Sequence, residues 1–271
     1  MERKALFTDL DGTLLNSSSE ISPGNRAAIE ALRNAGHHIV LSTGRPLASA
    51  LKQAHTLGLT GKGCFLIAFN GGVLYDLEKH KVIDRVVIPL PLVFGIFDEI
   101  NRRGIHIQTY SEDHVLVEPR CENATAMKYC KRLGMDYQVI PSVRTLTRAP
   151  EKILLIDQDS RTKLDLVIEE VSPDYRESLD FYYSSRELLE IVPKGVNKGS
   201  AILKAAEYLG VSPENTVACG DEANDITMLQ TAHYGIAMKN AAASVLEVIP
   251  LVTKHDNDHD GVAEIIEEYF L

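Results

Sequence analysis

Near the N-terminus stands FTDLDGT, residues 7–13. The apolar residues 5–7 predict a short buried strand that runs to Asp9, and the Gly12-Thr13 step predicts a turn after it. Because side chains alternate along a strand, Asp9 and Asp11 leave it on the same side, where two carboxylates repel each other unless a cation lies between them. Such a pair indicates metal binding or acid–base chemistry, although two turn-forming aspartates without a function would give the same pattern.

The composition is that of a globular protein with an excess of acidic residues. The 271 residues are 45% hydrophobic and 24% charged, with a formal net charge of −10, and their number allows two domains or one domain with an insertion. The acidic balance argues against a nucleic-acid surface, and no apolar run predicts a membrane span or a signal peptide. The four cysteines show no C-x-x-C spacing, so we expect buried thiols in a reducing compartment. We therefore expect a cytoplasmic protein that binds neither nucleic acid nor a membrane.

Strand and helix patterns alternate in two separate parts of the chain. The predicted strands are 5–9, 38–42, 65–69, 216–219 and 234–238, and the predicted helices are 22–35, 46–57, 198–209 and 224–230. Unbroken apolar strands separated by helices indicate a parallel sheet that is covered by helices. We therefore expect an α/β core, a Rossmann-like doubly wound parallel sheet, built from residues 1–82 and 195–271.

The pattern between these two parts is different. Residues 82–87 and 105–117 alternate like strands, a further strand is predicted at 152–156, and helices are predicted at 92–103, 123–133 and 161–171. Pro89 and Pro91 mark one junction, and the Pro193–Gly195 step marks the other. We expect residues 83–194 to form an inserted α+β domain.

Two further loops carry groups that suit an anion. Residues 41–46, LSTGRP, follow a predicted strand, and the Thr43 hydroxyl, the Gly44 N–H and the Arg45 guanidinium could hold a phosphate. Lys198 opens a predicted helix, where a cation is unfavourable unless an anion accompanies it. Alone, the first pattern is equally typical of an ordinary loop, and the second is more typical of a surface lysine.

The stretch CGDEAND, residues 219–225, follows another apolar strand. Asp221 and Asp225 are four residues apart across a loop and a helix start, close enough to face one cation. Helix capping would account for one of Asp221, Asn224 and Asp225, but hardly for all three. By contrast, the residues 255–260, HDNDHD, are interpreted as a solvated turn rather than a metal cluster, and His37 and His38 as structural.

The four loops that carry the paired aspartates, the LSTGRP stretch, Lys198 and the CGDEAND stretch are expected at one rim of the sheet. The reason is that ligands of open parallel sheets bind at the carboxyl ends of the strands. The four aspartates Asp9, Asp11, Asp221 and Asp225 would form an oxygen-rich site for a hard cation such as Mg²⁺. Lys198, Arg45 and Thr43 would face a phosphoryl oxygen.

The four motifs, D-x-D-G-T, S/T-G-R, N-K-G and G-D-x-x-N-D, together resemble the signature of the haloacid dehalogenase-like phosphatases. Residues 70–72, NGG, and 238–241, MKNA, are most similar to the Cof-type sugar-phosphatase branch. That branch carries a large α/β cap of the C2 type between the second and third motifs, and such a cap implies a lid that excludes water and selects the leaving group.

The resemblance implies a role for each acidic residue. Asp9 would be the nucleophile that forms an aspartyl-phosphate, and Asp11 would move the proton as general acid and base. Mg²⁺ would be held by the Asp9 carboxylate, the Asp11 backbone carbonyl and Asp221. Asp225 would bind the metal through water or orient Lys198.

The resemblance also implies two sets of binding residues. The phosphate-binding set is Leu10, Thr43, Gly44, Lys198 and Asn224. The substrate-binding set is Arg45, Asn70, Gly71 and Glu190.

The sequence thus predicts a Mg²⁺-dependent phosphatase, a monomer or homodimer, that acts on small phosphorylated metabolites such as sugar phosphates. A phosphomutase of the same superfamily and a non-catalytic phospho-ligand-binding protein remain as alternatives. A dehalogenase is disfavoured, because it has no use for Asp11.

Overall fold

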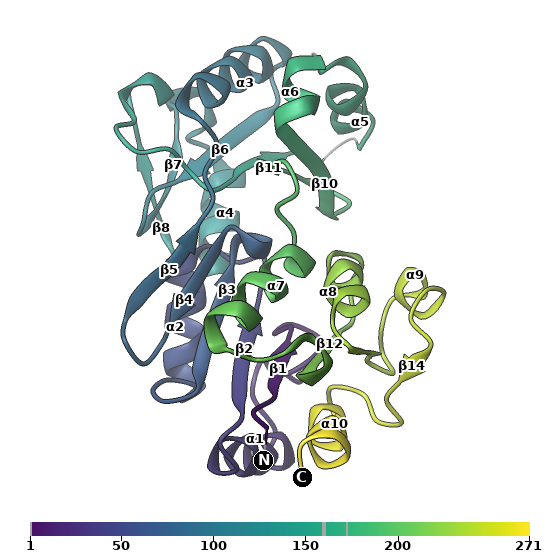
Figure 1. Ribbon diagram of the computed structural model, residues 1–271. Helices are drawn as coiled ribbons and strands as arrows, with labels where there is room; N and C mark the ends of the chain where they lie inside the picture. Colours follow the sequence, from purple (N-terminus) through teal and green to yellow (C-terminus); the bar gives the residue numbers. More distant parts are fainter. Residues whose placement is uncertain (1, 159–160, 172) are drawn as a thin grey trace. The chain divides into compact units, whose positions relative to one another are not determined.

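The computed structural model describes residues 2–158, 161–171 and 173–271. The chain divides into two compact units (Figure 1). The first unit consists of the residues up to Gly44, Ala50–Asp84 and Asn197–Leu271, and the second of Arg45–Ser49 and Arg85–Val196.

An eight-stranded sheet forms the centre of the first unit, in the order β14-β13-β12-β1-β2-β3-β4-β5. Its strands are β1 (Ala5–Thr8), β2 (His38–Ser42), β3 (Cys64–Ala68), β4 (Val73–Asp76), β5 (Lys81–Arg85), β12 (Thr216–Gly220), β13 (Tyr234–Ala237) and β14 (Leu251–Val252). Every pairing from β14 to β3 is parallel, whereas β4 runs antiparallel to β3. The predicted α/β fold with a parallel-sheet core is confirmed, and the antiparallel β4 is an addition that the apolar pattern did not reveal.

The chain order reverses at β1, which lies between β2 and β12. Thr8, the last residue of β1, is in register with Leu41 of β2 and with Cys219 of β12. The segments that follow these three strands therefore leave the sheet at the same edge, the switch point at which open α/β sheets bind ligands.

Helices cover the sheet of the first unit. They are α1 (Pro23–Asn34), α2 (Leu47–Thr56), α7 (Lys198–Leu209), α8 (Ile226–Thr231), α9 (Ala243–Leu246) and α10 (Gly261–Tyr269). Side chains of α7 and α8, such as Ile202 and Met228, pack with Phe7 of β1 in one buried cluster. The helix predicted at 224–230 begins as a 3-10 turn, Ala223–Asp225, and only then continues as α8.

The second unit contains a six-stranded sheet in the order β10-β11-β9-β6-β7-β8. Its strands are β6 (His106–Tyr110), β7 (His114–Val117), β8 (Asp136–Val139), β9 (Ile153–Ile156), β10 (Leu179–Ser185) and β11 (Leu188–Pro193), and its helices are α3 (Leu90–Arg103), α4 (Ala124–Leu133), α5 (Arg161–Glu170) and α6 (Pro173–Ser178). The hairpin β10–β11 lies outside the predicted elements, because charged and aromatic residues interrupt its apolar pattern.

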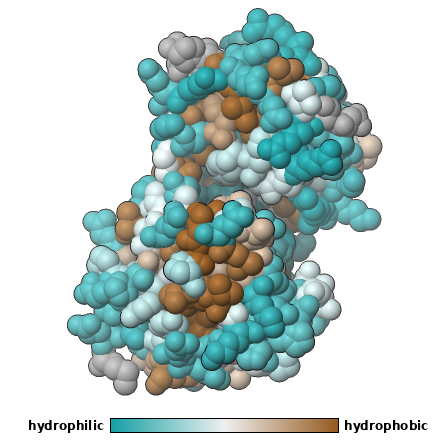
Figure 2. Space-filling view, turned by 90° about the vertical axis from the view of Figure 1, so that its right-hand side faces the viewer, coloured by the Kyte–Doolittle hydropathy of each residue, from teal (hydrophilic) through white to brown (hydrophobic). Residues whose placement is uncertain are grey.

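The surface of the first unit has an apolar area at the β14 edge of the sheet. Leu246, Val248, Leu251 and Val252 are all exposed there, and Figure 2, which faces this side, shows hydrophobic residues gathered on it. Within the described residues, no helix is long and apolar enough to cross a membrane.

Gly199 provides a test of how closely α7 and α8 pack. A Cβ at this position would lie 2.4 Å from the Thr227 carbonyl oxygen, so a side chain there must push the two helices apart. We expect Gly199→Ala to lower the free energy of unfolding by about 1–3 kcal/mol, although alanine is ordinarily the better helix former. Chemical denaturation measures the change. The control Leu203→Ala, at an exposed position of the same helix, should change stability little, and a stabilised Gly199→Ala protein would contradict the close approach.

Candidate active site

A buried lysine joins two of the predicted aspartates. Lys198 is the first residue of α7 and is 1% exposed. Its Nζ donates to Asp9 Oδ1 at 2.5 Å and to Asp225 Oδ1 at 2.6 Å. Asp9 directly follows β1 and Asp225 ends the 3-10 turn after β12, so this one cation ties together three segments that are far apart in the sequence.

The loop after β12 brings a third carboxylate to the same place. Asp221 is buried, and its Oδ1 accepts a hydrogen bond from the Thr13 hydroxyl at 2.6 Å. The second oxygen of Asp225 accepts from the backbone N–H groups of Asp221 and Glu222, both at 3.0 Å. Carboxylate oxygens of Asp9, Asp221 and Asp225 all lie within 4.8 Å of one another. The sequence-predicted acidic residues are therefore brought together here, with the exception of Asp11, whose side chain is exposed.

Burial decides the protonation tendencies of the cluster. It raises the pKa of Asp9 well above its usual value; Lys198 opposes this shift, and Asp225 and Asp221 add to it. Burial likewise raises the pKa of Asp221 to about 6. The hydrogen bond from Thr13 lowers this pKa, whereas the charge of Asp225 adds to the rise. Burial alone would lower the pKa of Lys198, but the carboxylates of Asp225 and Asp9 outweigh it and raise the value. Lys198 is thus held in its charged form, and the carboxylates lie close enough to repel one another.

The donor set fits a hard divalent cation. Three carboxylates and one lysine carry a net charge of −2 when all are ionised, and such oxygen-rich sites suit Mg²⁺ or a similar ion. Asp9 and Asp221 are the residues best able to bind it directly. Both oxygens of Asp225 are already engaged, so this residue supports the site by holding Lys198 and the Asp221 loop.

The glycine of the first motif is a geometric requirement. Gly12 has a φ of +82°, and a Cβ there would lie 2.4 Å from Asp221 Oδ2. The turn that it makes is closed by a hydrogen bond of 2.8 Å from Leu15 N to the carbonyl of the buried Leu10. Asp11 therefore stands on a short, tightly bent segment in which the next residue, Gly12, packs against Asp221.

A second group of predicted residues gathers around Asn70. The backbone N–H of Asn70 donates to the Thr43 carbonyl at 3.0 Å, and its Oδ1 accepts from Asn224 Nδ2 at 3.1 Å. Asn70 is 2% exposed with a φ of +55°, and a Cβ on Gly44 would touch its side-chain amide at 2.9 Å. The structure thus links Thr43, Gly44 and Asn224 through this buried amide.

Close packing requires a glycine at position 71. A Cβ at this position would lie 2.3 Å from the carbonyl oxygen of Asn197, the N-cap residue of α7. The glycine lets the turn after β3 approach the start of the helix that carries Lys198.

Two of the predicted substrate-binding residues belong to the second unit. Arg45 is half-buried and falls within the segment Arg45–Ser49. Glu190 lies on β11, is 4% exposed and pairs with the equally buried Lys152, whose Nζ is 3.1 Å from Glu190 Oε1.

Sequence reasoning missed two residues of these clusters. The sequence predicts only a turn at Thr13, although the hydroxyl of this residue orients Asp221; its place directly after the D-x-D-G step could have pointed to it. Lys152 precedes an apolar strand, where a buried lysine requires a partner that only the folded chain supplies.

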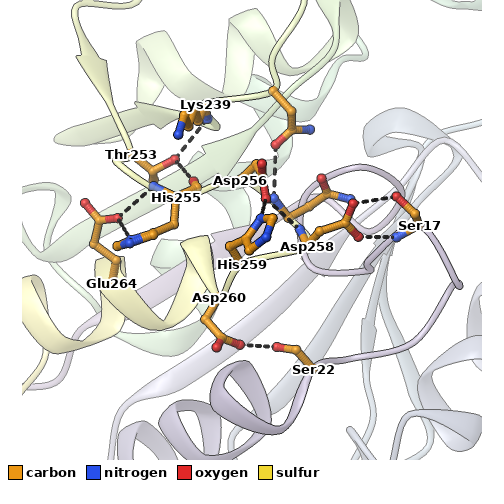
Figure 3. A network of polar contacts seen from close by, with 12 residues as sticks. Ser17, Ser22, Lys239, Thr253, His255, Asp256, Asp258, His259, Asp260 and Glu264 are labelled. Carbon is orange, nitrogen blue, oxygen red and sulfur yellow. Dashed lines mark hydrogen bonds and ion pairs between the residues drawn. The ribbon is translucent and has the colours of Figure 1, made fainter.

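Two other histidine-containing segments lie away from the acidic cluster. The side chains of His255 and His259 are exposed; His255 contacts Glu264 of α10, and His259 contacts Asp256 in the loop before that helix (Figure 3). Among the described residues, the one acidic group with metal-binding geometry is the cluster of Asp9, Asp221 and Asp225. His37 is buried, accepts a hydrogen bond from the N–H of Lys4 and packs edge-on against Phe270.

Comparison with known proteins gives consistent results over the whole chain. Residues 6–266 match the model of the haloacid dehalogenase-like hydrolase family. The chain is 31% identical to the Bacillus subtilis 5-amino-6-(5-phospho-D-ribitylamino)uracil phosphatase YcsE, over 99% of this chain and 96% of that protein. It is 27% identical to the Escherichia coli pyridoxal phosphate phosphatase YbhA over the full length of both.

Solved structures agree with the sequence relatives. The crystal structure of a haloacid dehalogenase-like hydrolase from Bacteroides thetaiotaomicron has a TM-score of 0.86 and 30% identity, covering 99% of this chain and all of that one. The family resemblance drawn from the four motifs is thereby confirmed, and the chain belongs to the haloacid dehalogenase-like hydrolases.

Proposed function

We propose that this protein is a Mg²⁺-dependent phosphatase that hydrolyses small phosphorylated metabolites through an aspartyl-phosphate on Asp9. The observation that carries the proposal is the buried cluster in which Lys198 Nζ contacts Asp9 at 2.5 Å while Asp221 and Asp225 lie within 4.8 Å of it. Phosphatase chemistry agrees with the named activities of YcsE and YbhA.

In the first half-reaction, the Asp9 carboxylate attacks the phosphorus of the ester. A bond forms between Asp9 and phosphorus while the bond from phosphorus to the leaving oxygen breaks, and Asp11 gives its proton to that oxygen. The exposed position of Asp11 on the bent Gly12 turn suits a group that must exchange protons with substrate and water.

In the second half-reaction, Asp11 takes a proton from a water molecule that attacks the phosphorus. The bond between Asp9 and phosphorus then breaks, which releases inorganic phosphate and restores the Asp9 carboxylate. The charge of Lys198 lies against Asp9 and opposes the rise in pKa that burial causes, so it favours the ionised form of the nucleophile.

The bound cation supplies neutralisation of the negative charge that builds up when a carboxylate approaches a phosphate dianion. Asp9, Asp221 and the backbone carbonyl of Asp11 would hold it. Asp225 would orient Lys198, since both of its own oxygens already accept hydrogen bonds.

The transferring phosphoryl group would be held by fixed donors at the strand ends. The proposed set is Leu10 N–H, the Thr43 hydroxyl, Gly44 N–H, Lys198 and Asn224. The buried Asn70 supports this set, because it fixes the Asn224 amide and the Thr43 carbonyl at the same time. Donors that are fixed before the reaction stabilise charge in the transition state without a cost of reorganisation.

The second unit would select the leaving group. We propose residues 83–194 as the inserted cap, with Arg45, Asn70, Gly71 and Glu190 as substrate contacts. Glu190 brings a carboxylate whose charge Lys152 balances at 3.1 Å, which suits recognition of a polar, hydroxylated leaving group such as a sugar.

We further propose a cytoplasmic enzyme, monomeric or homodimeric, that acts on free metabolites rather than on nucleic acid. The net charge of −10 disfavours a polyanionic partner. The four cysteines are buried free thiols, as is usual in a reducing compartment.

A panel of phosphate esters tests the function as a whole. Phosphorylated sugars, nucleotides and coenzymes, pyridoxal phosphate included, would be compared by kcat/KM in the presence of Mg²⁺. Release of inorganic phosphate supports the proposal. An isomerised sugar phosphate would indicate a phosphomutase, and tight binding without turnover would indicate a phospho-ligand-binding protein.

Replacement of the nucleophile should abolish turnover and leave the fold intact. We expect Asp9→Asn to reduce kcat by about 10⁴-fold or more, because an amide cannot form the acyl-phosphate, while thermal unfolding remains cooperative. The matched control Asp136→Asn removes an exposed carboxylate of β8 and should keep full activity. Mg²⁺-dependent phosphatase activity retained in Asp9→Asn would refute the assignment of the nucleophile.

Removal of the metal should affect activity and stability together. Treatment with EDTA should abolish turnover, and Mg²⁺ at about 100 times its Kd should restore it and add about 2.7 kcal/mol to the free energy of unfolding. Thermal unfolding with and without Mg²⁺ measures the second effect. Asp221→Asn should lose most of this stabilisation and Asp136→Asn should keep it; equal stabilisation of both variants would place the metal elsewhere.

A further inference from the structure

Two asparagine side chains from distant loops hold the backbone that follows the predicted general acid. Asn240 Nδ2 donates to the Gly12 carbonyl at 2.8 Å, and Asn257 Nδ2 donates to the Leu15 carbonyl at 2.9 Å. Asn240 lies after β13 and Asn257 lies after β14, more than 220 residues along the chain from the carbonyls that they bind.

The two amides are coupled to each other. The backbone N–H of Asn257 donates to Asn240 Oδ1 at 3.1 Å, so each asparagine fixes the other as well as its own carbonyl. The neighbouring Asp258 accepts from both the N–H and the hydroxyl of Ser17 at 2.7 Å, which extends the contact along the same segment (Figure 3). We name Asn240, Asn257 and Asp258 the asparagine clamp.

The segment that the clamp holds is also fixed on its other side. Within Asp11–Leu15, the backbone N–H of Leu15 donates to the Leu10 carbonyl, and the Thr13 hydroxyl donates to Asp221 of the acidic cluster. The clamp binds the carbonyls of Gly12 and Leu15, so the turn is fixed both by the Asp221 loop and by the loops after β13 and β14. A small rotation at Gly12 would move Asp11, because glycine itself offers little resistance to a change of φ and ψ.

We infer that Asn240 and Asn257 are positioning residues, which act on the reaction by fixing the backbone of Asp11 relative to Asp9 and Asp221. The effect on catalysis rests on the proposed phosphatase function, whereas the effect on the backbone does not. Neither asparagine touches a carboxylate of the acidic cluster in the contacts described above, so they act through the Gly12 turn and not on the substrate. Misplacement of a reacting group by about 1 Å can cost about 100-fold in rate, so a partial loosening of this turn has a measurable consequence.

The kinetic experiment compares Asn240→Ala and Asn257→Ala with two controls. His259→Ala removes the contact with Asp256 in the same loop as Asn257 and keeps both amide contacts with the Gly12 and Leu15 carbonyls. Asn215→Ala removes an amide that binds Glu2 and Ser212. We expect each clamp variant to lower kcat about tenfold with KM within about twofold, and both controls to match the wild type.

A conservative variant separates the lost donor from the lost side chain. Asn240→Asp keeps the oxygen that accepts from Asn257 N but cannot donate to the Gly12 carbonyl. It should lower kcat as Asn240→Ala does. Because the two amides are coupled, the double variant Asn240→Ala/Asn257→Ala should be no slower than about the worse single variant.

Hydrogen exchange tests the backbone effect independently of activity. Exchange of the Leu15 amide, read by mass spectrometry on a peptide that covers residues 10–17, should be about fivefold faster in the clamp variants. It should be unchanged in His259→Ala and Asn215→Ala.

The outcomes separate this inference from the proposed function. Faster exchange with unchanged kcat, or an equal loss of kcat in His259→Ala, would overturn the positioning role. Unchanged exchange would overturn the clamp itself. A wild-type protein without phosphatase activity on the ester panel would refute the proposed function, and the exchange comparison would still decide whether the clamp holds the turn.

Discussion

The contact of Lys198 with Asp9 and Asp225 is the constraint on which the rest of the site depends. A fully buried ammonium is very unfavourable unless charged partners surround it, and the start of a helix is the wrong end for a cation. Lys198 stands in both situations, and the carboxylates at 2.5 and 2.6 Å offset both. The removal of Lys198 would leave both buried carboxylates without their shared countercharge, so β1, α7 and the turn after β12 have to assemble together.

The parallel sheet makes this assembly possible without distorting any strand. β1 pairs with β12 so that Thr8 lies opposite Cys219. Each of these two strands then ends within one or two residues of an aspartate. Carboxylates that are more than 200 residues apart in the sequence meet because neighbouring parallel strands end at the same edge. Helix α7, which covers the sheet, brings Lys198 to the same edge. The geometry of the site is therefore a property of strand register and not of any single loop.

The sequence predicted this part of the protein well because its signals are local. The apolar strands β1 and β12 are each followed directly by an aspartate, and the first helix lies within its predicted range, 22–35, with Ser22 as its N-cap. The hairpin β10–β11 and the buried pair of Lys152 and Glu190 escaped, since their patterns acquire meaning only from partners across the sheet. The same holds for Asn240 and Asn257. Nothing in their neighbouring residues indicates that their amides bind the carbonyls of Gly12 and Leu15, because such contacts depend on where two distant loops come to lie.

The last motif, G-D-x-x-N-D, can be explained as one physical unit. A Cβ on Gly220 would lie 2.5 Å from the Cβ of Asp225, so the glycine is what allows Asp225 to fold back under the strand end. From there Asp225 accepts the backbone N–H groups of Asp221 and Glu222 with one oxygen and Lys198 with the other. Because both of its oxygens already accept hydrogen bonds, Asp225 has little capacity left for a metal. In the proposed function, this leaves Asp221 to face the cation and Asn224 to face the anion. The two aspartates of this motif are thus chemically alike but differ in what their environment leaves them free to do.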